Sequence, residues 1–313
     1  MDNGTLAHQL RDDPADTVDS PPKGAPTGDV AIVPEERSRH IPYAGPVAGL
    51  PPQTGLTTDS AVFTNAYAVI PRTVMRDIVT SYLPGWAGMR MWILARPLTG
   101  FAETFSQYIV ELVEGGGSDQ PDDDPEVQHA LFVTGGEMCV TIDGTEHFLK
   151  PGGFAYIPAG TRWSVQNCTP GNTGFHWWRK RWQPCNGVQK PSVFVTREQD
   201  IAPSPMPDTE GAWATTRFMD PADLGHDMHI TLVTLQPGGS IPFAETHVME
   251  HGLFVLEGKA VYRLNRDWVE VGAGDYMWLR AFCPQACYAG GPGRFRYLLY
   301  KDVNRHAGLW RQT

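Results

Sequence analysis

Three side chains that could bind a divalent cation lie close together in the sequence: Glu245, His247 and His251. Residues two apart on an extended strand point to the same face, and His251, four residues beyond His247, would share that face on a continuing strand. Histidines combined with a carboxylate are typical of a catalytic metal, which keeps coordination positions open, rather than of a closed structural zinc site. The spacing therefore predicts a metal centre, the alternative being a half-exposed polar strand edge.

An apolar run at 253–256 follows these residues and ends at Gly258, as a buried strand would. The same order of short apolar runs, turns and glycines occurs twice, at 132–157 and again at 254–279. A repeat of roughly 120 residues indicates an internal duplication. Two copies of a small β-barrel with equivalent strand order are therefore expected to position the candidate ligands.

The composition favours an all-β protein, because short β-rich runs are separated by turn residues throughout a chain with 33 Gly and 27 Pro among 313 residues. The formal net charge of −10 argues against general nucleic-acid binding. The sequence contains no run of about 20 apolar residues, the length needed to span a membrane. The five cysteines form no C-x-x-C pair, and the N-terminus is polar without a signal sequence. Reduced thiols in a cytoplasmic protein are the simplest interpretation.

Composition also divides the chain into four parts. Residues 1–55 are rich in Pro, Gly, Asp and Ser and predict a flexible tail, since they cannot bury enough apolar surface to order themselves. Residues 56–182 predict a first barrel without a metal, and residues 213–313 predict a second, metal-binding barrel. The proline-rich stretch 183–212 predicts the linker between them.

The repeated pattern resembles the cupin superfamily, whose fold is a double-stranded β-helix, a small jelly-roll barrel. The usual first cupin motif, G-x5-H-x-H-x3-4-E-x6-G, is matched from Gly239 to Gly258 with Glu and His exchanged. Counting from Gly274 in the second motif, Gln285 occupies the usual ligand-histidine position. The resemblance implies a bicupin with two tandem barrels and a metal held by four residues: Glu245, His247, His251 and Gln285.

The exchanged motif, the strand around Tyr262 and the sequence Tyr297-x3-Lys301-Asp302 resemble the (S)-ureidoglycine aminohydrolase family of purine (allantoin) catabolism. That resemblance implies Mn²⁺-dependent hydrolysis of (S)-ureidoglycine to (S)-ureidoglycolate and ammonia by a homo-oligomer. It also implies that Tyr262, Tyr297 and Lys301 bind the small ureido substrate, with Lys301 pairing with its carboxylate. Glu245 and Lys301 are the expected catalytic residues, with Glu245 moving protons as a general acid and base.

The charge of the implied ligand set agrees with that chemistry. Two imidazoles, a carboxylate and an amide form a mixed nitrogen and oxygen set that suits Mn²⁺. Because the Gln285 amide is neutral, Glu245 is the one charged ligand, so the site stays positive and favours an anionic substrate. Cys283 and Cys287 share the parity of Gln285; a thiolate ligand would favour zinc, but we interpret both as core residues.

The first copy departs from the ligand pattern. Counting back from Gly135, its ligand positions hold residues other than histidine: Asp122, Asp124 and Gln128. Trp163 takes the position of the second-motif histidine, and an indole cannot ligate a cation. His129, one residue off, is expected to face the other side of its strand. We therefore expect the first barrel to be a scaffold and interface, with its acidic loop at 119–126 solvated rather than bound to calcium.

Two other functions stay open at this point. One is another metal-dependent bicupin, such as an iron dioxygenase or an isomerase. Dioxygenases prefer two or three histidines with facing sites for oxygen, so Gln285 and the exchanged Glu245 argue against that class. The other is a non-catalytic cupin that binds a metabolite, which would not need Lys301 and both tyrosines beside an intact ligand set.

Overall fold

The computed structural model describes residues 43–46, 61–76, 80–97, 101–302 and 305. The predicted tail, residues 1–55, therefore lies outside the described residues except for 43–46. Regular structure within the described residues is almost entirely β, as predicted. The helices there are short 3-10 segments, η2 (Arg72–Val74) and η4 (Glu198–Asp200), and none could cross a membrane.

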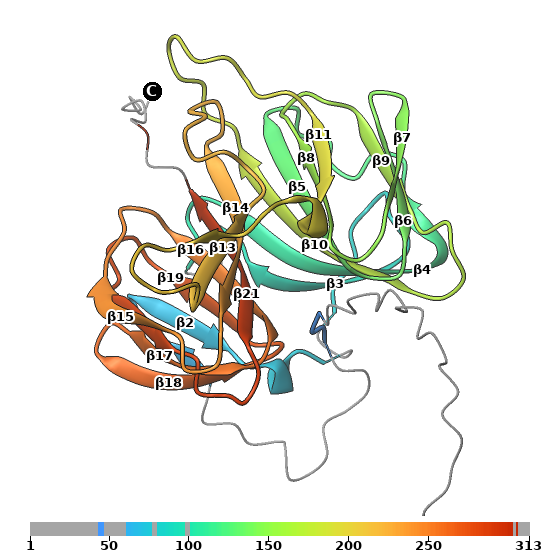
Figure 1. The fold of residues 1–313 in the computed structure, drawn as a ribbon. Coiled ribbons are helices and arrows are strands. Elements are labelled where there is room, and N and C mark those ends of the chain that lie inside the picture. Colours follow the sequence, from blue (N-terminus) through green and yellow to red (C-terminus); the bar gives the residue numbers. More distant parts are fainter. Residues whose placement is uncertain (1–42, 47–60, 77–79, 98–100, 303–304, 306–313) are drawn as a thin grey trace, which may run out of the picture. The chain divides into compact units, whose positions relative to one another are not determined.

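The first copy of the repeat forms one sheet with the strand order β11-β8-β5-β10-β4-β9-β6-β7, and β3 pairs with β4 (Figure 1). The strands are β3 (Ala87–Ala95), β4 (Ser106–Ser118), β5 (Val127–Gly135), β6 (Met138–Ile142), β7 (Thr145–Leu149), β8 (Gly153–Ile157), β9 (Trp163–Gln166), β10 (Thr173–Arg181) and β11 (Phe194–Arg197). Neighbouring strands are antiparallel throughout, as in a jelly-roll barrel.

The second copy is built from an eight-stranded sheet, β1-β2-β19-β16-β21-β14-β13-β12, and a four-stranded sheet, β15-β20-β17-β18. The strands are β1 (Val62–Phe63), β2 (Tyr67–Ile70), β12 (Ser204–Pro205), β13 (Trp213–Arg217), β14 (Met228–Leu235), β15 (Ser240–Glu245), β16 (His251–Glu257), β17 (Lys259–Leu264), β18 (Asp267–Gly272), β19 (Tyr276–Leu279), β20 (Gln285–Tyr288) and β21 (Phe295–Asp302). The predicted pair of barrels is therefore present.

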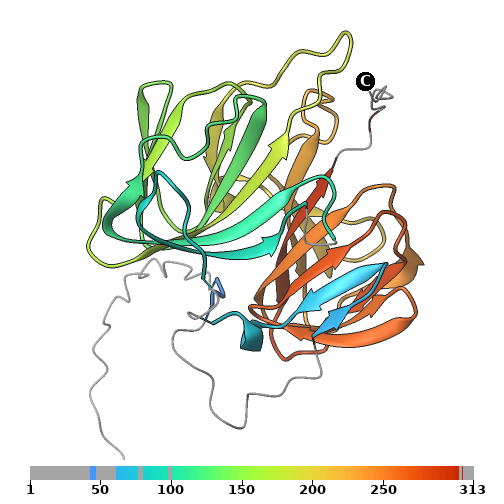
Figure 2. The same cartoon turned by 180° about the vertical axis from the view of Figure 1, so that it is seen from behind.

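Two strands join a barrel that the expected boundaries did not assign them to. β2, expected in the first barrel because it lies within 56–182, pairs with β19 of the second barrel, with Tyr67 opposite Leu279. Figures 1 and 2 show this blue strand among the orange strands of the second copy. β11, within the expected linker 183–212, pairs with β8 of the first barrel. Sheet membership thus differs from the composition-based boundaries, because each segment completes an edge of the barrel it reaches.

Strand alternation separates three cores. On β5, Leu131 packs inside the first barrel, whereas its neighbour Phe132 packs in a core that both barrels share. On β16, Leu253 packs inside the second barrel and Phe254 packs in the shared core. Successive strand residues face opposite sides of a sheet, so odd-numbered positions on these two strands face the barrel interiors.

Candidate active site

The predicted ligands are brought together by strand register at one end of the second barrel. β15 ends at Glu245, which lies opposite Gln285 on β20. β16 begins at His251, which lies opposite Lys301 on β21. His247 lies on the loop between β15 and β16, where its carbonyl oxygen accepts a 2.6 Å hydrogen bond from the backbone N–H of Phe282. Glu245 and Lys301, 56 residues apart in sequence, thus come together because β15 and β21 end, and β16 and β20 begin, at the same mouth of the barrel.

A cavity of about 140 Å³ opens at this point. Six of the seven predicted site residues line it: Glu245, His247, His251, Gln285, Tyr297 and Lys301. The hydroxyl of Thr215 and the indole N–H of Trp213 are buried beside it, and neither has a hydrogen-bond partner among the described residues. Buried polar groups without partners are costly, so these two favour a polar occupant of the cavity.

The donor atoms are of the types that the sequence predicted. His251 is 3% exposed, and burial, followed by the nearby His247 and Lys301, lowers its pKa to about 3, so that the imidazole is neutral and able to ligate. Gln285 is 4% exposed. Neither side chain has a hydrogen bond within the described part of the chain, so both have donor atoms free for another ligand.

The remaining two donors contact each other. The Nε2 atom of His247 lies 3.4 Å from Oε1 of Glu245, and the rings of His247 and His251 are 5.1 Å apart at an angle of 86°. As they stand, no three His, Cys, Asp or Glu side chains of the described residues surround a common point. The donor set of two imidazoles, a carboxylate and an amide nevertheless fits a divalent cation, which would take the place of the Glu245–His247 contact.

The two predicted substrate tyrosines differ in their access to the cavity. Tyr297 lines it, whereas Tyr262 is not among the lining residues. Tyr262 is fully buried and donates a 3.2 Å hydrogen bond to the Tyr297 hydroxyl. This contact orients Tyr297. It leaves the hydroxyl proton of Tyr297 free to be donated to a group in the cavity.

The cavity contains a second cationic side chain, which the sequence analysis did not predict. Arg217, at the end of β13, lines the cavity together with Lys301. Burial lowers the pKa of Lys301, and the positive charge of Arg217 lowers it further, while Glu245 opposes the shift. No motif marked Arg217, because it comes from a strand outside both cupin motifs and joins the site only through the pairing of β13 with β14.

The structure bears out the interpretation of the two flanking cysteines. Cys283 and Cys287 have free thiols and are buried in the core of the second barrel. Neither lines the cavity. Burial raises the pKa of both thiols, which keeps them protonated and unsuited to bind a metal.

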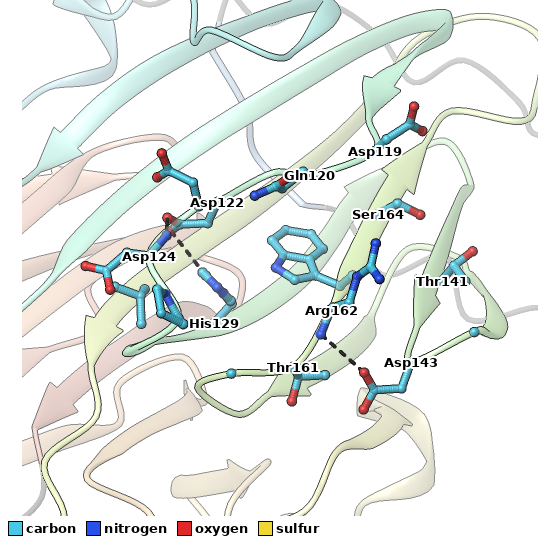
Figure 3. Close-up of a pocket in the computed structure, with 16 residues that line it drawn as sticks. Asp119, Gln120, Asp122, Asp124, His129, Thr141, Asp143, Thr161, Arg162 and Ser164 are labelled. Carbon is cyan, nitrogen blue, oxygen red and sulfur yellow. Dashed lines mark hydrogen bonds and ion pairs between the residues drawn. The ribbon is translucent and has the colours of Figure 1, made fainter.

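The expectation for His129 is wrong. His129 faces the interior of the first barrel and lines a cavity there (Figure 3), whereas Gln128 faces the shared core and hydrogen-bonds to Asp227 and Tyr156. The reason is the glycine used for counting. Gly136, not Gly135, has the left-handed backbone (φ 66°) that matches Gly258 (φ 75°), so every position shifts by one. His129 is therefore the counterpart of His251.

The acidic loop is not simply solvated either. The side chain of Asp122 is only 2% exposed, and its Oδ2 atom lies 2.5 Å from both Nε and Nη2 of Arg179. Asp124 pairs with Arg181 at 2.6 Å. The position of Trp163 is as predicted, since it lies opposite Ile142 just as Gln285 lies opposite Leu264.

Comparison with known proteins places these features in a family. A profile of the cupin domain matches residues 108–178 and 231–300, which confirms the duplication. The chain is 64% identical to a protein from Pseudomonas aeruginosa described as glyoxylate-induced, whose crystal structure superimposes with a TM-score of 0.81 over 87% of this chain and 100% of that one.

Curated relatives narrow the assignment. An (S)-ureidoglycine aminohydrolase from Escherichia coli (strain K12) is 30% identical over 231 residues, which make up 73% of this chain and 86% of that protein. An (S)-ureidoglycine aminohydrolase from Arabidopsis thaliana is 32% identical over 229 residues, or 73% of this chain and 74% of that protein. With two jelly-roll barrels and the exchanged Glu and His ligand positions in the second, this chain belongs to the (S)-ureidoglycine aminohydrolase family of bicupins.

Proposed function

We propose that the protein hydrolyses (S)-ureidoglycine to (S)-ureidoglycolate and ammonia, with Mn²⁺ bound in the second barrel. The observation that carries this proposal is the meeting of four metal-type donors with two cationic side chains in one cavity of about 140 Å³. In the reaction, the bond between the α-carbon and its amino nitrogen breaks, water supplies the hydroxyl group, and the nitrogen leaves as ammonia.

The cations account for binding of an anionic substrate. Lys301 and Arg217 both line the cavity, and neither has an ion-pair partner among the described residues. A carboxylate placed between them would pair with both cations. It would offset their mutual repulsion, which contributes to the lowered pKa of Lys301. The Tyr297 hydroxyl, held by Tyr262, is placed to donate a hydrogen bond to a carboxylate or ureido oxygen.

The metal would be held by four side chains: Glu245, His247, His251 and Gln285. When bound, Mn²⁺ supplies Lewis-acid chemistry at a site that remains net positive. Glu245 is the candidate for moving a proton between water and the leaving amine, because it is the carboxylate of the cavity and reaches His247 at 3.4 Å. Lys301 contributes by fixing the substrate carboxylate relative to these groups.

The test is ammonia release from freshly generated (S)-ureidoglycine, with metal content measured on the same preparation. Activity that follows manganese content, and is absent from a His251→Ala variant that is folded but without metal, supports the proposal. A fully manganese-loaded protein that releases no ammonia above the spontaneous rate would reject it.

We also propose that the protein is a homo-oligomer. The four-stranded sheet of the second barrel leaves three large aromatic side chains more than half exposed: Phe243 (58%), Trp268 (62%) and Tyr288 (51%). They come from three of its four strands, β15, β18 and β20. A contiguous apolar face of this kind is typical of an interface between protein chains. Light scattering that shows only a 34.6 kDa species at micromolar concentration would refute this proposal.

A further inference from the structure

The first barrel contains the larger cavity, of about 800 Å³, at its open end (Figure 3). The loop from Asp119 to Pro125 forms one side, and the ends of β6 and β9 form the other. A cavity of this volume lies within the range of about 300–1,000 Å³ that small-molecule sites occupy. It is therefore large enough for a metabolite, although this barrel was expected to be a scaffold and interface.

The cavity occupies the place that the candidate active site occupies in the second barrel. His129 lies opposite Arg179 in the first barrel, as His251 lies opposite Lys301 in the second. Trp163 takes the place of Gln285. The two cavities are thus duplicated positions whose side chains differ, and these differences indicate what each can bind.

The cation at the duplicated position is neutralised in the first barrel and, within the described part of the chain, unpaired in the second. Arg179 is neutralised by Asp122, through two 2.5 Å contacts to one carboxylate oxygen, whereas Lys301 has no ion pair among the described residues. Asp124 is neutralised by Arg181.

The lining charges that remain without an ion pair in the described part of the chain are three carboxylates, Asp119, Asp123 and Asp143, and one guanidinium, Arg162. This balance of two net negative charges disfavours an anion and favours a cation.

The inner wall is aromatic and neutral. The rings of His129 and Trp163 are 5.1 Å apart, and Trp177 donates a 3.3 Å hydrogen bond from its indole N–H to Nδ1 of His129. Burial, together with the charge of Arg179, lowers the pKa of His129 to about 3, so this ring carries no positive charge. Trp163 is 6% exposed, and its indole N–H has no acceptor in the described residues, so this wall has a polar group that its neighbours leave unsatisfied.

A metal ion is not the occupant that this wall suits. An indole, which cannot ligate a cation, stands where the second barrel has an amide donor. The face of an indole instead attracts organic cations, through the negative potential of its π system.

We propose that the first barrel binds a small organic cation carrying an ammonium or guanidinium group, with the cation against the Trp163 wall and the carboxylates Asp119, Asp123 and Asp143 as its counter-charge. This site is separate from the proposed aminohydrolase site, and the two differ in the sign of the charge they select. A cationic probe without a carboxylate is disfavoured in the second cavity by Lys301 and Arg217.

The test uses agmatine as the probe in titration calorimetry of the full chain, with butylurea as an uncharged comparison and succinate as an anionic one. Agmatine should bind, and butylurea and succinate should bind much more weakly or not at all. Asp123→Asn should weaken agmatine binding by about fivefold, and Arg162→Gln should strengthen it by a similar factor, because each changes one charge beside the probe.

The matched control is Glu270→Gln, an exposed residue on β18 of the second barrel that makes the same charge change outside the cavity and should leave binding unchanged. Equal binding of agmatine and butylurea would overturn the proposal, as would agmatine binding that neither Asp123→Asn nor Arg162→Gln changes. Absence of agmatine binding would also overturn it. Since the readout is binding rather than ammonia release, its failure is distinguishable from failure of the proposed activity.

Discussion

Replacing Lys301 by methionine tests the proposed function most directly. Lys301 lies on β21 opposite both His251 and His229, and its side chain lines the cavity beside Arg217. Methionine keeps most of the length of the side chain and removes only the ammonium group. The metal donors are untouched, so metal content should not change.

The size of the effect follows from the kind of contact that is lost. A hydrogen bond to a charged group contributes about 1.5–3 kcal/mol, which corresponds to a loss of about 10- to 150-fold in kcat/KM. Arg217 remains as a second cation, so we expect the lower half of that range. The loss should fall mainly on KM, because a counter-charge for the substrate carboxylate acts in the ground state and in the transition state alike.

The pH dependence gives a second readout from the same residue. Because the pKa of Lys301 is lowered from its usual 10.5, raising the pH removes its charge earlier than for an exposed lysine. The KM of the wild-type protein should therefore rise on the alkaline side, and Lys301→Met should abolish this rise while keeping its own high KM.

The assay is steady-state ammonia release as a function of substrate concentration and pH, with manganese quantified for each variant. Lys259→Met is the matched control, because Lys259 is an exposed residue of β17 that lies 3.7 Å from Glu270 and outside the cavity. The reasoning would be refuted if Lys301→Met retained the wild-type KM at full metal occupancy, or if Lys259→Met raised KM to the same extent.

Three further predictions concern the metal donors and the shared core. His251→Ala should empty the metal site without unfolding the protein, which elemental analysis and circular dichroism would check; a variant that retains one equivalent of manganese would contradict the ligand assignment. Gln285→Glu should retain the metal but raise KM by about fivefold, since the added carboxylate cancels one positive charge; unchanged kinetics at full occupancy would count against this electrostatic account. His176→Phe should reduce acid sensitivity, because burial in the shared core lowers the pKa of His176 from 6.5 to about 3. The unfolded chain takes up that proton first, so stability is lost as the pH falls below about 6.5, by about 2 kcal/mol at pH 5 for this residue, and urea unfolding at pH 7.5 and pH 5 should show a smaller difference for the variant than for the wild type.

Much of the second barrel was readable from the sequence because its determinants are local. Glu245, His247 and His251 lie within seven residues of one another, and the apolar run after them shows which way the strand faces. The duplication was visible for the same reason, since each copy repeats the same order of short strands and turns. Predicting these features requires only the period of a β-strand and the turn preferences of glycine.

The sequence did not show which residues of the first barrel face its interior. The reason is that Gly135 and Gly136 were both possible starting points for counting positions along the strand. Only the backbone shows that Gly136 adopts the left-handed conformation, and that choice turns His129 into its barrel and Gln128 out of it. A shift of one residue exchanges the two faces of a strand. The expectation of a solvated Asp122 was wrong for a related reason, since Arg179, 57 residues later, buries and pairs it.

The sequence by itself determined that the chain is all-β and that it carries two copies of one barrel, and it predicted which four donors the second copy would offer to a metal. The tertiary structure alone decided that β2 completes the opposite barrel, that Arg217 joins Lys301, and that the first barrel encloses the larger cavity. The physical reason is one of range. Strand period and turn chemistry act over a few residues, whereas strand pairing, ion pairing and cavity volume depend on contacts between segments far apart in the chain.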